Sequence, residues 1–174
     1  KVVWRKLRKM AERKIEFRSI GIIHTPYKES APNQPIEDAE GSFSIVVAPV
    51  FQEGLYLLEK FRYIYVIYHI DRLARRVNMV VKPPWAGGVQ VGLFASRSPL
   101  RPNPIGLSIV RLKKIEENVI YTSGLDVFDG TPLLDIKPYI KDLDSKMDAD
   151  YGWIEDLDNR DHLILHIKGI PHEY

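Results

Sequence analysis

The sequence predicts a mainly β fold, an antiparallel β-barrel with a few helical additions. Short stretches rich in Val, Ile, Tyr and Phe recur along the 174 residues, turn residues separate them, and strands do not alternate regularly with helices. A Rossmann fold needs a glycine-rich turn between a first strand and a helix. Gly87, Gly88 and Gly92 do not supply that fingerprint, so a Rossmann fold is not expected.

Length and composition indicate one globular domain without disulfides. A chain of 174 residues can bury one hydrophobic core, and this chain has no cysteine. No apolar run approaches the roughly 20 residues that span a bilayer, and the basic start lacks the apolar stretch of a signal peptide. We therefore expect a soluble, cytoplasmic protein that does not associate with membranes.

Residues 1–17 are expected to form a basic helical arm, because apolar residues recur there at helical spacing as far as Ala11. Residues 1–18 hold eight Lys and Arg against two Glu, a net charge of +6, whereas the whole chain carries +2. A basic arm on a mildly acidic body suggests an anionic partner. A solvated helix face, or a face that docks on a second subunit, explains the same pattern.

The rest of the chain reads as strands joined by loops and short helices. The β-branched and aromatic runs predict strands over 17–23, 42–49, 61–70, 77–81, 105–115, 118–125, 133–136 and 162–168. Residues 27–41 lack an apolar period and form a long loop, 51–60 a short helix, and 142–161 a partly helical acidic segment. The run FRYIYVIYHI is continuously apolar and aromatic, so we expect that strand to be buried on both faces.

Residues 91–108, VGLFASRSPLRPNPIGLS, carry the densest local information in the sequence. Three prolines fix φ and remove backbone donors between residues 98 and 105, so this stretch can be neither helix nor central strand. The result is a stiff loop that presents Arg97 and Arg101, two planar cations suited to a carboxylate, a phosphate or a ring face. A loop that only closes a hairpin, with solvated arginines, remains the alternative.

The string FASRSPLRPNPIGLS resembles the signature of the TsaA-like family, whose best-understood members are the TrmO methyltransferases of threonylcarbamoyladenosine in tRNA. The resemblance continues, in family order, in IGIIHTPYK (20–28), NQP (33–35), FRYIYVIYH (61–69) and DVFDGTPLLDIKPYI (126–140). It therefore identifies residues 18–141 as the expected β-barrel methyltransferase domain. Residues 142–174 are expected to be an extension packed on the same domain.

The resemblance implies S-adenosyl-L-methionine as methyl donor, the N6 nitrogen of threonylcarbamoyladenosine beside the tRNA anticodon as acceptor, and a homodimer. It places the donor at Asn33, Gln34, Pro35, His69, Ile70, Arg97, Leu107, Asp129, Gly130, Thr131 and Pro132. Arg97 is the expected clamp for a carboxylate or a ring, and Asp129 is the candidate catalytic base. Many relatives have a polar residue after the histidine, whereas Ile70 leaves a backbone contact there.

Basic residues mixed with aromatic ones indicate an RNA-binding face, where cations meet phosphates and rings stack on unpaired bases. The candidates are Tyr27, Arg76, Lys82, Trp85 and Arg101. Charges that form salt bridges on an edge strand would give the same pattern.

Two other functions remain open from the sequence. A non-catalytic RNA-binding β-barrel would use the same basic and aromatic residues without binding a methyl donor. A metal-dependent hydrolase would use His162 and His166, four residues apart on one strand face, with an Asp of the acidic segment. No third ligand has a fixed spacing to these histidines, so we expect no metal site.

Overall fold

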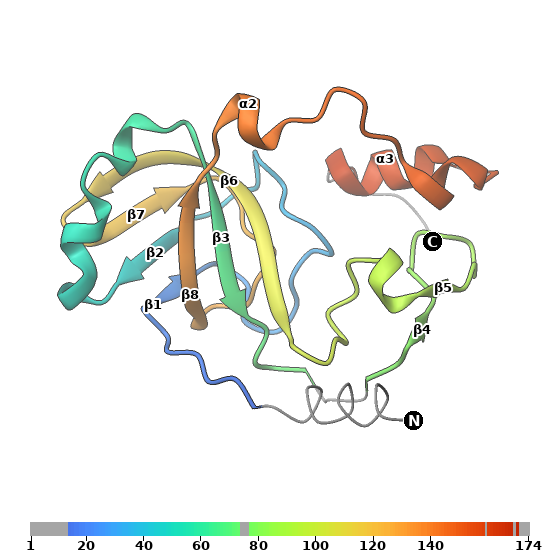
Figure 1. Cartoon of the computed structure of the whole chain (residues 1–174), viewed down its shortest axis with the longest axis horizontal. Coiled ribbons are helices and arrows are strands. Elements are labelled where there is room, and N and C mark those ends of the chain that lie inside the picture. The colour runs from blue at the N-terminus through green and yellow to red at the C-terminus, as the bar shows by residue number, and fades with distance from the viewer. Residues whose placement is uncertain (1–13, 74–76, 159, 169, 171–174) are drawn as a thin grey trace, which may run out of the picture.

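The computed structural model describes residues 14–73, 77–158, 160–168 and 170, and six strands of this part close into an antiparallel barrel (Figure 1). In their order around the barrel they are β1 (Gly21–His24), β2 (Ser44–Val47), β7 (Val119–Thr122), β6 (Ile105–Glu116), β3 (Tyr63–His69) and β8 (Thr131–Pro138). Strands β4 (Val80–Val81) and β5 (Val91–Gly92) form a separate two-stranded sheet. The predicted mainly β, non-Rossmann barrel is confirmed.

Short helical segments connect and extend the strands. They are the 3₁₀ helices η1 (Pro49–Leu55), η2 (Leu58–Lys60), η3 (Leu93–Ala95) and η4 (Gly152–Asp156), and the α-helices α2 (Lys141–Asp144) and α3 (Arg160–Lys168). The single helix predicted over 51–60 is divided, because Leu57 takes a left-handed φ of 66° between η1 and η2. The helix predicted in the N-terminal arm lies outside the described residues.

Two sequence predictions about burial and secondary structure are wrong. The strand 61–70 is not buried on both faces: Ile64, Val66 and Tyr68 are buried, while the residues between them are half-buried. A barrel has one interior, so alternate side chains of β3 point outward. The expected last strand over 162–168 lies in the helix α3, where Leu163 is buried.

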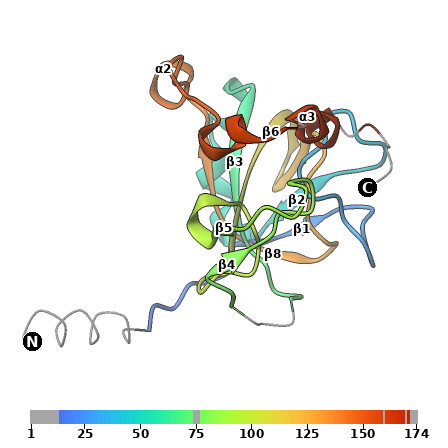
Figure 2. The same cartoon turned by 90° about the vertical axis from the view of Figure 1, so that its right-hand side faces the viewer.

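The sheet β4–β5 and helix α3 lie together beside the barrel, as both views show (Figure 2). None of the helices in the described residues has the length and apolar character that a membrane span requires. The hydrophobic core lies inside the barrel. It is formed by inward-pointing side chains such as those of Ile23, Ile45, Ile64 and Leu133, each 0% exposed. The segments outside the barrel depend on a few specific contacts instead of a core of their own.

One glycine of β6 is required by the packing of the barrel. A Cβ on Gly106 would lie 2.0 Å from Cε2 of Tyr68 and 2.3 Å from its Cζ. The Tyr68 ring is buried at 6% exposure, so it has little room to move away. Gly106 therefore admits the Tyr68 ring into the barrel.

We predict that Gly106→Ala lowers the free energy of unfolding by about 3 kcal/mol, because overpacking a buried ring costs that much. Chemical denaturation measures the change. Gly92→Ala is the matched control, since Gly92 is also a strand residue and no atom lies within 4 Å of its Cβ position. Equal losses in the two variants would contradict this account of Gly106.

Candidate functional site

One end of the barrel, which we call the mouth, holds the last residues of β1 and β3 and the first residues of β6 and β8. His69 ends β3 and pairs with Ile105, and Ile67 pairs with Leu107. On the other side of β3, Tyr68 pairs with Leu133, next to Pro132. Strand register therefore brings three separate parts of the predicted donor site together at the mouth.

The turn before β8 forms one side of the mouth. Thr131 donates its backbone N–H and its hydroxyl to the carbonyl of Phe128, at 3.2 and 2.7 Å. Gly130 takes a φ of 84°, a left-handed conformation that favours glycine. The N–H of Asp129 donates to the carbonyl of Tyr27 at 2.7 Å. The predicted donor residues 129–132 are thus fixed against the chain that leaves β1.

The Asp129 carboxylate contacts His24 and Thr25, at the end of β1. Its Oδ1 lies 2.9 Å from Nδ1 of His24 and accepts the N–H of Thr25 at 3.3 Å. The bond to His24 is the main cause that holds the pKa of Asp129 below its ordinary value. A lower pKa makes Asp129 a weaker base than an ordinary carboxylate. The expected catalytic role of Asp129 stays a prediction.

A second carboxylate, Asp126, lies inside the mouth with Tyr68 and Ser108; we call these three the mouth cluster. Ser108 Oγ donates to Asp126 Oδ1 at 2.9 Å. The Tyr68 hydroxyl lies 3.4 Å from the same oxygen and 3.1 Å from Ser108 Oγ. Burial is the main cause that raises the pKa of Asp126, and burial also raises the pKa of Tyr68. The charge of Arg97 opposes both of these rises in pKa, so Arg97 lies near enough to the cluster to act on it electrostatically.

Sequence reasoning did not single out the mouth cluster as a site. One signal is present in the chain: Tyr68 and Ser108 occupy inward positions of two strands whose other inward residues are apolar or glycine. A polar group at such a position needs a hydrogen-bond partner. That partner, Asp126, is remote in sequence and is identified by the tertiary structure alone.

The loop between β1 and β2 brings Asn33, Gln34 and Pro35 toward the segment that contains Asp126. A Cβ on Gly124 would lie 2.1 Å from the carbonyl oxygen of Ile36, so the loop backbone passes directly over this glycine. Among the described residues, Gln34 Nε2 is buried and has no hydrogen-bond partner. A buried donor left in that state costs about 1–3 kcal/mol, which a ligand with an acceptor atom would recover.

The two arginines of the proline-rich loop, residues 96–104, differ in their surroundings. Arg101 Nη1 donates to the carbonyls of Leu93, Ser96 and Ser98 at 3.4, 2.9 and 3.5 Å. Its guanidinium also lies 5.6 Å from the centroid of the Phe94 ring. Arg101 therefore stabilises the loop from within, whereas Arg97 is exposed. We call this segment the Arg97 loop.

The other predicted RNA contacts are placed unequally. The Tyr27 ring packs on Phe43 with centroids 5.8 Å apart, and the Trp85 ring stacks on Trp153 at 5.5 Å. Lys82 is exposed at the end of β4. Arg76 lies outside the described residues. The two aromatic candidates thus already have intramolecular ring partners.

Beside the mouth, His69 is half-buried, and the N–H of Ile70 donates to the carbonyl of Pro104 at 2.8 Å. The Ile70 side chain packs against the core. The Ile70 N–H thus links the end of β3 to the Arg97 loop. Because this N–H is already bonded, the expected backbone contact of Ile70 with the donor cannot use it.

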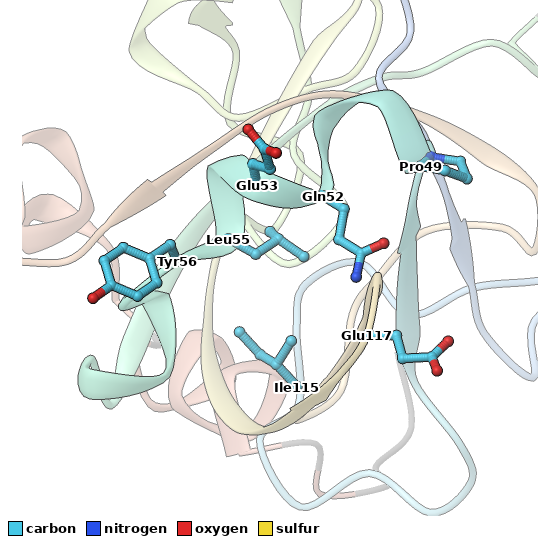
Figure 3. Close-up of a pocket in the computed structure, with 7 residues that line it drawn as sticks. All are labelled: Pro49, Gln52, Glu53, Leu55, Tyr56, Ile115 and Glu117. Atoms are coloured by element: carbon cyan, nitrogen blue, oxygen red, sulfur yellow. The ribbon is translucent and has the colours of Figure 1, made fainter.

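A hollow of about 570 Å³ lies at the opposite end of the barrel (Figure 3). It is lined by Pro49, Gln52, Glu53, Leu55, Tyr56, Ile115 and Glu117. Ile115 lies about 26 Å along β6 from Leu107 at the strand rise of ~3.3 Å per residue. The hollow contains no predicted site residue, and its two glutamates disfavour a polyanion, so we do not assign the donor or RNA to it.

The described residues contain no group of three or more His, Cys, Asp or Glu side chains that could hold a metal ion. The hydrolase alternative assumed that His162 and His166 share one face of a strand. That strand is the helix α3, so the geometry from which the alternative was argued is not present.

The protein is a closed antiparallel barrel and therefore belongs to a β-barrel class of ligand-binding proteins, not to the Rossmann class. One end of the barrel holds two carboxylates whose pKa values shift in opposite directions, with the exposed Arg97 nearby. The chain belongs to the family described as the tRNA-methyltransferase O N-terminal domain, whose model matches residues 22–145.

Relatives and solved structures agree with this assignment. A probable S-adenosyl-L-methionine-binding protein of Pyrococcus abyssi is 43% identical over 80% of this chain and 76% of its own length. The tRNA (adenine(37)-N6)-methyltransferase of Escherichia coli is 35% identical over 80% of this chain and 64% of its own length. The crystal structure of TrmO from Pseudomonas aeruginosa matches with a TM-score of 0.66 and 30% identity, over 80% of this chain and 62% of that one. The chain thus spans less than two thirds of these two methyltransferases.

We predict that Asp126→Asn leaves the protein at least as stable as wild type at pH 7. The pKa of Asp126 is raised on folding, so its stabilising contribution is complete below the ordinary value of 3.8 and is lost as pH rises through the raised value. An asparagine keeps an oxygen for the Ser108 and Tyr68 hydroxyls without burying a charge. Thermal unfolding from pH 3 to pH 8 measures the difference, which should shrink at the acidic end.

Asp135→Asn is the matched control, because this carboxylate pairs with Lys137 on the surface, at 2.7 Å. Its stability relative to wild type should change little with pH, since an exposed ion pair contributes less than about 1 kcal/mol. A large loss of stability for Asp126→Asn at pH 7 would show that the ionised carboxylate stabilises the fold.

Proposed function

We propose that the protein transfers a methyl group from S-adenosyl-L-methionine to the N6 nitrogen of threonylcarbamoyladenosine next to the anticodon of tRNA. The proposal is carried by one observation: strand register gathers predicted donor residues from β3, β6 and β8 at the mouth, and the Arg97 loop leads into the first residue of β6 there. The names of the relatives support both the donor and the tRNA substrate. Such a protein works in the cytoplasm, where its tRNA substrate is found.

The residues of the mouth fit a ligand that combines a carboxylate, cationic centres and an adenine. Arg97 supplies an exposed guanidinium for a carboxylate. The unpaired Nε2 of Gln34 supplies a donor for a carbonyl or a ring nitrogen. The half-buried carboxylates of Asp126 and Asp129 supply negative charge for a cationic centre. Leu107, which is 56% exposed, supplies an apolar surface beside them.

S-adenosyl-L-methionine supplies a methyl group that its sulfonium charge has already activated. The chain must therefore mainly orient two reactants and exclude water, which are effects of proximity and of the local environment. The rigid turn 128–131 and the proline-rich Arg97 loop meet this need, because both are fixed by internal hydrogen bonds.

The acceptor nitrogen must lose a proton, and two carboxylates at the mouth can take it. Asp129, the candidate from sequence, is the weaker base because His24 and Thr25 stabilise its charged form. Asp126 is the stronger base, and the Ser108 and Tyr68 hydroxyls occupy one of its oxygens. Asp129 stays our assignment, since its side chain is the more accessible of the two, with 36% of it exposed.

A homodimer is part of the proposal, and an apolar stripe on the outer face of β6 supports it. Ile105, Leu107 and Ile109 are 38%, 56% and 46% exposed. An apolar stripe on the outside of a barrel is typical of a surface that another protein covers. Because the stripe begins at the mouth, a second copy on it would lie beside the donor site.

We predict that Arg97→Ala raises the dissociation constant for S-adenosyl-L-methionine at least tenfold, because a charge-assisted hydrogen bond contributes about 1.5–3 kcal/mol. Isothermal titration calorimetry measures the change, and the melting temperature should stay at the wild-type value because Arg97 is exposed. Lys113→Ala, which removes an exposed cation at the other end of β6, is the control and should bind like wild type. Wild-type affinity in Arg97→Ala would remove Arg97 from the donor site.

We predict that Ile109→Glu dissociates the dimer by placing a charge in the apolar stripe, with an effect of about 2 kcal/mol or more on association. Light scattering over a concentration series measures the mass. Leu143→Glu is the control, since Leu143 is 65% exposed and lies away from β6 on α2. A wild-type protein that stays monomeric at all concentrations would contradict the homodimer.

Titration of wild type with S-adenosyl-L-methionine separates this function from the non-catalytic RNA-binding alternative. Saturable binding of the donor, followed by methylation of a threonylcarbamoyladenosine-containing tRNA, is the expected result. Binding of RNA that weakens steeply with salt, without any binding of the donor, would favour the alternative.

A further inference from the structure

The C-terminal segment reaches the Arg97 loop from outside the part of the chain that the family model matches. That match ends at residue 145, whereas Trp153 belongs to η4. The indole N–H of Trp153 donates to the carbonyl of Ala95 at 2.8 Å. Ala95 is the last residue of η3 and lies two positions before Arg97. One hydrogen bond therefore joins the C-terminal segment to the approach of the Arg97 loop.

The same side chain makes a second contact. The Trp153 ring stacks on Trp85, with centroids 5.5 Å apart and planes inclined by 8°. Trp85 lies in the turn that joins β4 to β5, and this turn is anchored by the buried Pro83 and by Ala86, which is 3% exposed. Trp153 thus bridges an anchored turn and Ala95, the residue immediately before the Arg97 loop.

The Arg97 loop is attached to the rest of the structure mainly at its two ends, so a contact such as that of Trp153 helps to hold it in place. Before the loop, Leu93 is 1% exposed and its N–H donates to the carbonyl of Met79 at 2.9 Å. After the loop, β6 begins at Ile105. Between them the prolines restrict φ, and Arg101 bonds within the loop, so the loop is stiff but its orientation toward the mouth is set from elsewhere.

We infer that Trp153 is a positioning residue: its hydrogen bond to Ala95 and its stack on Trp85 hold the Arg97 loop in its place beside the mouth. The inference rests on the proposed function for the identity of the ligand, S-adenosyl-L-methionine, and on the observed contacts for the orientation of the loop. It also gives Trp85 a function other than stacking on an RNA base, because one of its ring faces supports Trp153.

The test separates the hydrogen bond from the ring stack. Trp153→Phe keeps an aromatic ring on Trp85 and removes the N–H, and Trp85→Ala removes the stack and keeps the N–H. Met147→Ala is the matched control, because Met147 is 96% exposed on the same C-terminal segment. Each variant is first checked for an unchanged melting temperature.

The first readout needs no ligand. Hydrogen exchange is measured at the amides of Ser96 and Ser98, which bond to the carbonyl of Leu93 and to Ser96 Oγ at 3.2 and 3.3 Å. We expect exchange at these amides to become faster in Trp153→Phe and in Trp85→Ala, and to stay at the wild-type rate in Met147→Ala. Unchanged exchange in both tryptophan variants would overturn the inference.

The second readout is the affinity for S-adenosyl-L-methionine by calorimetry. We expect a dissociation constant about three- to tenfold higher in Trp153→Phe, the effect of losing one hydrogen bond that orients a binding residue. Faster exchange with an unchanged dissociation constant would overturn the link between the loop and donor binding. If wild type itself binds no donor, the proposed function fails, and the hydrogen-exchange result alone decides whether Trp153 holds the loop.

Discussion

The pairing of β3 with β6 on one side and with β8 on the other is the constraint on which the rest of the structure depends. Pairing with β6 fixes the register over the whole length of β3, and pairing with β8 continues to Tyr68 after one register shift at Ile67, so the ends of these three strands meet at the mouth. A shift of one residue would turn Tyr68 and Ser108 outward and expose the apolar side chains of the barrel core. The close contact of Gly106 with the Tyr68 ring excludes side chains at that position and thereby supports the same register.

The mouth holds two carboxylates whose environments drive their acidities apart. Asp129 is stabilised in its charged form by His24, whereas Asp126 is buried among the hydroxyls of the mouth cluster. The charge of Arg97 opposes the rise in the pKa of Asp126, so the charge balance of the site depends on the position of the Arg97 loop. Pairs of titratable groups with opposite shifts are characteristic of functional sites.

Much of the Arg97 loop was predictable, because proline acts on the backbone locally and needs no tertiary partner. The separate functions of its two arginines were not predictable. Arg101 is held by backbone carbonyls such as that of Ser96, whereas Arg97 is exposed, although both are arginines in the same proline-rich string. The last strand was wrongly predicted because a short apolar run with histidines at positions i and i+4 fits the periods of both a strand and a helix.

The sequence by itself determined the barrel class and the β3, β6 and β8 segments, since β-branched and aromatic runs, turn residues and the family motifs are local features of the chain. It did not determine that burial alternates along β3, because a continuously apolar run fits one buried face as well as two. Tertiary structure alone decided the mouth cluster, the stack of Trp85 on Trp153 and the unpaired amide of Gln34. Each of these depends on groups far apart in sequence or on the solvent exposure of one atom. Such contacts follow from how the closed barrel places its loops, which no local pattern of residues encodes.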